Sequence, residues 1–425
     1  MIGEQKSEIG DATTDAGTFM ACQYCATPLT ISWIDLGRQP LSNNYGTSQE
    51  MALAAPHYPL HARTCPQCWL VQVDRVVPPE DIFSDYAYFS SYSDSWLAHC
   101  REYAATMANR FDLKPENMVV EIASNDGYQL KYFQEAGISV LGIDPAANVA
   151  QVAIDAGIPT EVDFFGEDLA SRLVGRGIGA DHLSAKNVMA HVPDIGDFAR
   201  GVAILLKPEA VFTVEFPHLL ETMRRMQFDQ IYHEHFTYLS LLAVRRIFAD
   251  NGMRVFDVEQ VETHGGSLRV FICHDQASHA TSPAVDRVLC QESAEGLDRA
   301  EGYAGFNDRV AGIRRDFLDL LAAANAEGKT VSGYGAAAKG NTFLNYCGAQ
   351  PDTLAFIGDR SAAKAGRFMP GSGIPIMSPN AIDQQRPDYL VILPWNLSAE
   401  ISDQMASIRD WGGQFVTAIP EVRVF

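Results

Sequence analysis

Apolar and polar positions alternate through the middle of the chain with the periods of strands and helices. Residues 119–122 form a short apolar run typical of a buried parallel strand, residues 124–127 are polar and turn-like, and residues 128–136 have helical spacing. A second apolar run, residues 140–143, ends at Asp144. The pattern predicts a strand, a turn, a helix and a second strand, which together form the unit that surrounds a nucleotide-type cofactor.

The same alternation continues further along the chain. It predicts a strand over residues 185–192 that ends at His191, a helix over residues 193–206 and a strand over residues 210–216. Residues 265–274 alternate as late strands would. These elements predict a doubly wound α/β domain.

The predicted turn lacks the glycines of a dinucleotide-binding loop, because Ala123, Ser124, Asn125 and Asp126 stand in their place. The carboxylate would repel a pyrophosphate but would suit S-adenosylmethionine, which carries a sulfonium and an ammonium and no phosphate. Asp144 could accept hydrogen bonds from ribose hydroxyls. The alternative is an ordinary βα turn without a ligand. The predicted cofactor-binding residues are Glu121, Ala123, Asn125, Asp126, Gly127, Asp144 and Pro145.

A second α/β unit begins at Lys329, after helical periodicity over residues 282–327. Its loop matches G-x-G-x-x-A between a strand and a helix, and Asp359 ends the next strand. This motif is weak by itself, and it leaves open a purely structural lobe or an NAD-dependent oxidoreductase. A helix N-terminus with a lysine suits phosphate oxygens. The predicted phosphate-binding residues are Gly335, Lys339 and Asn341.

Four of the 8 cysteines form two C-x-x-C pairs, Cys22 with Cys25 and Cys65 with Cys68. Each pair can hold a metal through two thiolates, and two pairs complete a tetrahedron. Redox dithiols are the alternative, but neither pair lies in a strand–helix context of the thioredoxin type. The spacing therefore predicts one structural zinc.

Composition limits the remaining classes. The 425 residues allow two or three domains, and 53 acidic against 32 basic residues give a net charge of −21. That charge disfavours nucleic acid and anionic membranes as partners. No run of about 18 uncharged apolar residues occurs, so we expect no membrane span. Residues 1–20 lack the features of a signal peptide and are expected to be a disordered leader of a cytoplasmic protein.

The segment before Ser240 carries the candidate catalytic groups. Ser240 is a suitable N-cap, and the helix after it has an apolar face at Leu241, Val244, Ile247 and Phe248. Tyr232, His233, Glu234 and His235 therefore lie on extended or looped chain; if it is extended, the two histidines share one side. An H-x-H metal site and core histidines are alternatives. General acid–base chemistry is favoured because imidazole has a reference pKa of about 6.5.

The chain resembles a known family in an ordered set of segments: CQYC with CPQC, YFSSYS, EIASNDGYQL, NVMAHVPD, YHEHFTYLS, HGGSLR, GYGAAAKGNTFLNY and LPWNL. They are similar to the zinc-containing, S-adenosylmethionine-dependent nucleotide-sugar C-methyltransferases of deoxysugar biosynthesis. The resemblance implies an α/β protein in three parts. These are an N-terminal zinc-binding module (21–84), a central Rossmann-like class I methyltransferase domain (85–281) and a C-terminal Rossmann-like α/β lobe that binds the nucleotide sugar (282–425).

The resemblance also implies site residues and a reaction. His235 resembles the base, with Tyr232, Glu234, His191 and Tyr86 around a dTDP-linked 4-keto-deoxysugar. His233 is predicted to bind the substrate and is the main alternative to His235 as the base. Removal of the C3 proton beside the ketone would leave an enolate that takes the methyl group. O-methylation of a sugar hydroxyl would look similar in sequence. The aromatic segment 85–96 is either a cover for the sheet or a lid whose phenols reach the site.

Overall fold

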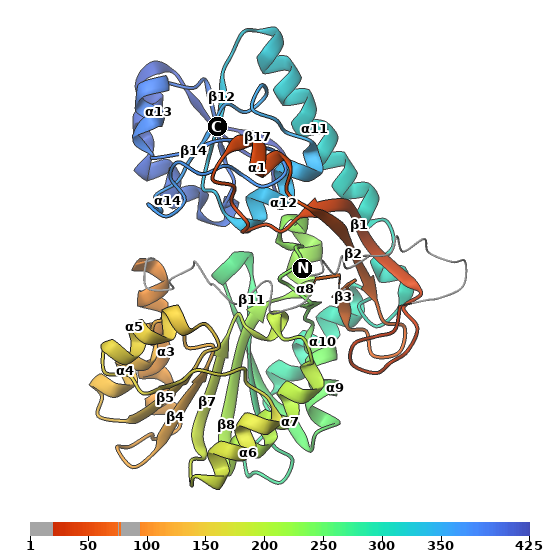
Figure 1. The fold of residues 1–425 in the computed structure, drawn as a ribbon. Coiled ribbons are helices and arrows are strands. Elements are labelled where there is room, and N and C mark those ends of the chain that lie inside the picture. The colour runs from red at the N-terminus through yellow and green to blue at the C-terminus, as the bar shows by residue number, and fades with distance from the viewer. Residues whose placement is uncertain (1–19, 75, 78–93) are drawn as a thin grey trace, which may run out of the picture.

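The computed structural model describes residues 20–74, 76–77 and 94–425. Their strands form a four-stranded, a seven-stranded and a six-stranded sheet. In Figure 1 the central lobe and the C-terminal lobe lie one above the other, and the N-terminal module lies beside their junction. Tyr86, most of the aromatic segment 85–96 and residues 1–19 of the expected leader lie outside the described residues.

The central sheet has the order β10-β11-β8-β7-β4-β5-β6. β8, β7, β4, β5 and β6 run parallel, and β11 is antiparallel to β8 and β10. The chain therefore changes direction of winding at β4, as the alternation of apolar runs predicts. The strands are β4 (Met118–Ile122), β5 (Ser139–Ile143), β6 (Thr160–Glu161), β7 (Ala180–Lys186), β8 (Leu206–Pro217), β10 (Met253–Val261) and β11 (Ser267–His274).

Helices cover both faces of this sheet (Figure 1). They are α3 (Asp94–Arg110), α4 (Leu130–Glu135), α5 (Ala147–Asp155), α6 (Glu167–Gly175), α7 (Ile195–Leu205) and α9 (Leu241–Ala249). α8 (Leu219–Arg224) lies instead at the junction with the other two parts, and short 3₁₀ turns are formed by η2 (Met189–His191), η3 (Phe228–Gln230) and η4 (Thr263–Gly265). Ser240 caps α9 by accepting a hydrogen bond from Ala243 N. This N-cap was predicted, and the structure confirms it.

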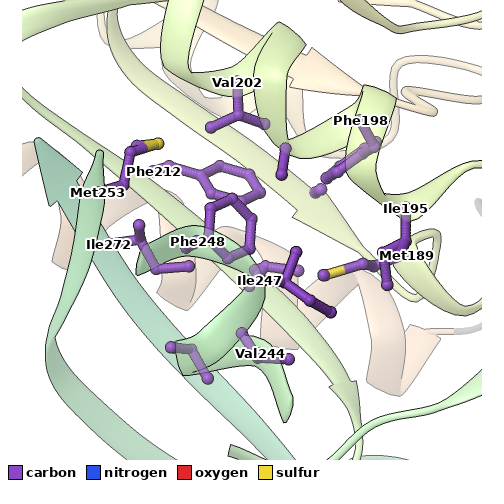
Figure 2. Packing of buried hydrophobic residues seen from close by; sticks show 14 of the residues in the cluster. Met189, Ile195, Phe198, Val202, Phe212, Val244, Ile247, Phe248, Met253 and Ile272 are labelled. Carbon is purple, nitrogen blue, oxygen red and sulfur yellow. The ribbon is translucent and has the colours of Figure 1, made fainter. Parts of the chain in front are cut away.

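The core of the central lobe shows why these elements pack as they do. Figure 2 shows Phe248 of α9 against Phe212 of β8, with Val202 and Phe198 of α7 on the other side. The Phe212 ring lies 5.7 Å from the Phe248 ring and 6.2 Å from the Phe198 ring, between centroids. The apolar face predicted for α9 is buried, as its 3.6-residue spacing requires.

One predicted strand is wrong in extent. Residues 185–192 were expected to form a strand ending at His191, but β7 ends at Lys186 and η2 follows. Asn187 has φ +53°, a left-handed conformation that ends the strand and that asparagine tolerates better than most residues. His191 therefore lies on a helical turn beyond the sheet edge.

The N-terminal sheet has the order β1-β2-β3-β9, and β9 comes from the central lobe. Its elements are β1 (Ile31–Pro40), α1 (Gln49–Leu53), β2 (His57–Thr64), β3 (Val71–Val73) and β9 (Thr237–Tyr238). β9 pairs antiparallel with β3, directly after the YHEH segment. The N-terminal module is thus built partly on the chain that carries the candidate catalytic groups.

The C-terminal lobe is a second doubly wound sheet, of order β14-β13-β12-β15-β16-β17, in which only the pairing of β17 with β16 is antiparallel. α10 (Pro283–Ala294) packs against β10 and α9 of the central lobe, and η5 (Ala300–Tyr303) lies against β1. The elements of the C-terminal lobe are α11 (Phe306–Ala326), β12 (Val331–Tyr334), α12 (Ala338–Cys347), β13 (Ile357–Gly358), β14 (Ile376–Met377), α13 (Asn380–Gln385), β15 (Tyr389–Ile392), η6 (Trp395–Leu397), α14 (Ser398–Gln404), η7 (Ala406–Trp411), β16 (Gln414–Thr417) and β17 (Arg423–Val424). No helix within the described ranges has the length and apolar character of a membrane span.

Candidate active site

The predicted cofactor turn lies at the carboxyl end of β4, where the winding of the sheet reverses. Ala123, Asn125 and Gly127 have φ values of +55°, +50° and +76°, so the backbone turns tightly back on itself. A side chain at Gly127 would place its Cβ 2.4 Å from Ile158 Cδ1, and glycine is therefore required there. Open α/β sheets bind ligands at this kind of crevice.

Asp144, at the end of β5, closes the turn. One carboxylate oxygen accepts a hydrogen bond from Asn125 N at 2.8 Å, and the other accepts one from Ala146 N at 2.9 Å. Pro145 lies between the carboxylate and the second donor. Burial raises the pKa of Asp144, and the two backbone donors oppose that rise. Each oxygen keeps one lone pair, so Asp144 can still accept from a ribose hydroxyl.

Glu121 is fully buried beneath the same turn. Among the residues that the structure describes, none forms a hydrogen bond of good geometry with either of its carboxylate oxygens. Burial raises its pKa well above the usual range, although Lys186 and the Tyr128 phenol act in the opposite direction. A buried carboxylate with unsatisfied oxygens fits a cationic ligand better than a phosphate. The predicted cofactor residues thus surround one site whose charge suits a sulfonium or an ammonium.

The YHEH segment forms a turn, not an extended strand. His235 N donates to Tyr232 O at 3.0 Å, which brings their side chains together. The Tyr232 hydroxyl lies 2.9 Å from His235 Nε2, and His235 Nδ1 lies 2.9 Å from Gln230 O. Because a carbonyl can only accept, Nδ1 carries the proton. Nε2 is therefore the basic nitrogen of His235.

His191 joins this pair from η2. Its ring lies 4.6 Å from the His235 ring, between centroids, and its Nδ1–H donates to Glu234 O at 2.8 Å. Burial lowers the pKa of His191 to about 4 and lowers that of His235 well below its usual value, with the neighbouring imidazole adding to the second shift. Both imidazoles are neutral at pH 7, which is the form in which a histidine can take a proton.

Glu234 and His233 both contact the N-terminal module. Both carboxylate oxygens of Glu234 accept from Asn43 Nδ2, at 2.7 and 2.9 Å, and burial raises the pKa of Glu234 to about 7. His233 is buried, and its Nε2 donates to Pro59 O at 3.1 Å. The structure therefore brings Tyr232, His235 and His191 together, and it directs His233 toward the N-terminal module.

The predicted phosphate loop of the C-terminal lobe faces the same region. Lys339 Nζ donates to Asn396 at 2.8 Å and lies 4.9 Å above the Trp395 ring. The Trp395 indole in turn donates to Asp229, next to Gln230, at 2.8 Å. The charge of Lys339 contributes to the lowered pKa of His235. Lys339 is thus directed toward the base turn.

The other two predicted phosphate residues differ in accessibility. Gly335 has φ +87°, and a Cβ there would lie 2.5 Å from Pro394 Cδ, so the loop needs a glycine. Asn341 is fully buried inside α12, where its Oδ1 accepts from Asn345. Asn341 therefore lies inside the lobe and not on the surface of the loop.

Four further residues belong to this region and were not among the predicted site residues. Asn187 Nδ2 donates to His264 Nε2 at 2.9 Å, and both residues have left-handed backbones. Lys364 Nζ donates to Ala336 O at 2.8 Å, at the phosphate loop, and Asn43 contacts Glu234. For Asn187 a signal existed: an asparagine after an apolar strand often takes the left-handed conformation. The contacts of the other three residues, His264, Lys364 and Asn43, join segments that are 77, 28 and 191 positions apart.

The four predicted zinc ligands meet in the N-terminal module. The sulfurs of Cys22, Cys25, Cys65 and Cys68 all lie within 4.8 Å of one another. The sulfurs of Cys22 and Cys68 are 3.6 Å apart, and those of Cys25 and Cys65 are 3.5 Å apart. Zinc–sulfur bonds of about 2.3 Å place the corners of a tetrahedron roughly 3.8 Å apart, so the arrangement fits zinc. Four thiolates leave no open position for a substrate, which makes the site structural.

Three domain families match the chain in order. Residues 22–83 match a domain described as zinc binding, residues 96–258 a methyltransferase domain, and residues 262–420 a C-methyltransferase C-terminal domain. Among solved structures, magnesium protoporphyrin IX methyltransferase from Synechocystis PCC 6803 has a TM-score of 0.33 and 14% identity, over 46% of this chain and 89% of that one. A methyltransferase from Anabaena variabilis has a TM-score of 0.35 and 14% identity, over 42% and 86%.

A curated relative matches almost the whole chain. C-methyltransferase NovU from Streptomyces niveus is 36% identical over 403 residues, which cover 95% of this chain and 96% of NovU. Because the alignment covers nearly the whole chain, it includes the greater part of each of the three matched domains. The chain therefore belongs to the C-methyltransferase family that includes NovU, and it is an S-adenosylmethionine-dependent enzyme with a zinc-binding N-terminal module.

Proposed function

We propose that the chain methylates C3 of a nucleotide-linked 4-keto-deoxysugar, with dTDP as the nucleotide, and that His235 generates the attacking enolate. The observation that carries the proposal is the fixed tautomer of His235. Gln230 O holds the proton on Nδ1, so the basic Nε2 lies beside Tyr232 and His191. The family membership supports carbon, and not oxygen, as the atom methylated.

The proposed first step is proton removal. His235 Nε2 takes the C3 proton, and the electrons of the C–H bond form a C3–C4 double bond while the ketone oxygen becomes an enolate. The Tyr232 hydroxyl is one hydrogen bond from Nε2 and is a candidate donor to that oxygen. The lowered pKa of His235 keeps it neutral before the step and makes its conjugate acid release the proton readily to water.

The second step is carbon–carbon bond formation. S-adenosylmethionine would supply an electrophilic methyl group bonded to its sulfonium sulfur. C3 of the enolate bonds to the methyl carbon, the sulfur–methyl bond breaks, and the sulfur keeps that electron pair. The turn at Glu121–Gly127 would hold the cationic donor through its buried carboxylate, and Asp144 would accept from the ribose. Lys339 and the N-terminus of α12 would hold the diphosphate of the sugar nucleotide. The base then lies between two ligands held by different lobes.

Product analysis tests the proposal. A panel of nucleotide 4-keto-sugars with S-adenosylmethionine is analysed by mass spectrometry, and the substrate is labelled with deuterium at C3. C3 methylation requires loss of that deuterium, whereas O-methylation of a hydroxyl retains it. A methylated product that keeps the label would contradict the proposal. Bound nicotinamide and hydride transfer would instead support an oxidoreductase that uses the C-terminal loop.

A further inference from the structure

The N-terminal module contacts the YHEH turn at three points. β3 pairs with β9, with Gln72 opposite Thr237. Pro59 O accepts from His233, and Asn43 donates to Glu234. All three contacts are made within five residues of the chain, on either side of His235. The module therefore forms one wall of the base turn.

Asn43 makes the contact that bears on chemistry. It is the only residue in the described part of the chain that donates a hydrogen bond to the Glu234 carboxylate. Glu234 as a residue is 6% exposed, so without the amide the charge of its carboxylate would lie in a nearly dry site. The backbone oxygen of Glu234 meanwhile accepts from His191. Glu234 thus contacts the N-terminal module through its side chain and His191 of the imidazole pair through its backbone oxygen.

The loop that carries Asn43 is also tied to the C-terminal lobe. The Tyr45 hydroxyl donates to Ala336 O at 2.7 Å and lies 3.3 Å from Asn43 Oδ1. Lys364 donates to the same carbonyl oxygen. Gly46 pairs with Phe368 through a short antiparallel bridge. These contacts fix the loop against the second lobe and so fix where Asn43 lies.

We infer that Asn43 is a positioning residue for the methylation: it orients the base turn by holding the Glu234 carboxylate. The inference rests on the proposed function, since it assigns Asn43 to the step that His235 performs. Asn43 itself is exposed, so its replacement leaves no cavity in the core. A hydrogen bond to a buried charged group is strong enough that its loss lowers a rate roughly 10-fold to 100-fold.

A double-mutant cycle on the full-length protein tests this role. The rate of C3 proton exchange with deuterated water is measured for wild type, Asn43→Ala, Glu234→Gln and the double variant. We expect Asn43→Ala to slow exchange roughly 10-fold to 100-fold in wild type and to change it less than about 2-fold in the Glu234→Gln background. The KM for S-adenosylmethionine should stay unchanged. Losses that multiply in the double variant would overturn the inference.

A donor–acceptor exchange provides the second readout. Asn43→Asp places two carboxylates face to face and should slow exchange more than Asn43→Ala does. Adding Glu234→Gln to Asn43→Asp restores one amide and one carboxylate in the opposite order, and it should recover part of the lost rate. No recovery would count against the inference. Asn44→Ala is the matched control, because the neighbouring Asn44 is exposed and its side chain makes no hydrogen bond to any residue that the structure describes.

The outcomes separate this inference from the proposed function. If wild type catalyses no C3 exchange on any nucleotide 4-keto-sugar, the proposed function fails. If wild type exchanges and Asn43→Ala exchanges at the wild-type rate, the proposed function stands and the role of Asn43 fails.

Discussion

The two α/β lobes have the same local architecture at the ends of β4 and β12, but their side chains differ. In each lobe an aspartate at the end of the second strand accepts a backbone N–H from the loop after the first strand. Asp144 accepts from Asn125 N at 2.8 Å, and Asp359 accepts from Ala336 N at 2.7 Å. Each aspartate also accepts a hydrogen bond from the backbone N–H two residues further along the chain, at 2.9 Å for Asp144 and 2.7 Å for Asp359. The two loops are thus closed by the same device.

The charge around the loops is what differs. In the central lobe the buried Glu121 lies beneath the turn and Asp126 lies within it. In the C-terminal lobe Lys339 and Lys364 lie at the loop, and the ten-residue helix α12 starts there. One backbone plan therefore provides an acidic site suited to a cationic methyl donor and a basic site suited to a diphosphate. The comparison teaches that one loop architecture can carry side chains of opposite charge, so the shared fold alone does not define what each loop would bind.

The largest expected effect comes from disrupting the zinc site of the N-terminal module, which lies beside both lobes. Cys65→Ser should lose zinc and abolish C3 exchange, because β3 would no longer hold β9 after His235. S-adenosylmethionine should still bind the central lobe by calorimetry. Metal analysis and exchange rates check this, with Cys290→Ser, at an exposed cysteine, as the control. Full activity without zinc would show that the lobes position the base by themselves.

Asp144→Ala and its counterpart Asp359→Ala test whether the shared device serves different ligands. Asp144→Ala should weaken S-adenosylmethionine binding by about 1–3 kcal/mol, because ribose hydroxyls lose a charged acceptor. Asp359→Ala should leave that affinity unchanged. Calorimetry with the cofactor alone measures both. Equal losses from the two variants would mean that the lobes do not divide the ligands between them.

Lys339→Ala tests the basic site. The KM for the sugar nucleotide should rise roughly 10-fold, because the diphosphate loses a charged donor, while cofactor affinity stays the same. Steady-state kinetics with each substrate varied in turn measures the split. Lys329→Ala, at an exposed lysine of the same lobe paired with Glu327, should change neither constant. A loss of cofactor affinity in Lys339→Ala would contradict the assignment of the basic lobe.

The smallest expected effect is on the pH dependence of stability and arises from Glu234. Burial raises the pKa of Glu234 to about 7, from an ordinary value of about 4.5. Between pH 4.5 and 7 the unfolded chain therefore releases this proton while the folded chain keeps it, so the group lowers stability as pH rises through this window. Glu234→Gln should remove that component and raise the melting temperature at pH 8, relative to pH 5, by roughly a few degrees at most. An unchanged difference between the two pH values would contradict the raised pKa.

Local patterns in the sequence predicted much of this architecture. The turn before α4, the cap of α9 and the two C-x-x-C pairs each depend on residues close together in the chain, whose spacing sets their geometry. The four sulfurs do meet, and Ser240 does cap its helix. The predicted length of β7 was wrong because apolar residues continue past Asn187, and hydrophobic periodicity cannot detect a single residue with a left-handed backbone.

Contacts between distant segments could not be predicted in the same way. Asn43 and Glu234 are 191 positions apart, and an exposed asparagine in a loop has no periodic signature. The addition of β9 to the N-terminal sheet depends on only two residues, too few for a strand pattern. The direction of His233, away from His235, follows from a turn that the sequence left open as extended or looped chain. These features arise from packing between lobes.

The central claim is that His235, held between an acidic and a basic lobe, removes the C3 proton. It is tested most directly by C3 deuterium incorporation into a dTDP-linked 4-keto-deoxysugar in deuterated water, with S-adenosylhomocysteine in place of the methyl donor. Wild type should exchange the C3 proton, and His235→Asn should bind both ligands but lose exchange. His233→Asn should lose much less of the exchange rate than His235→Asn, because the Nε2 of His233 bonds to Pro59 O. Near-normal exchange by His235→Asn would show that another group is the base and would contradict the account.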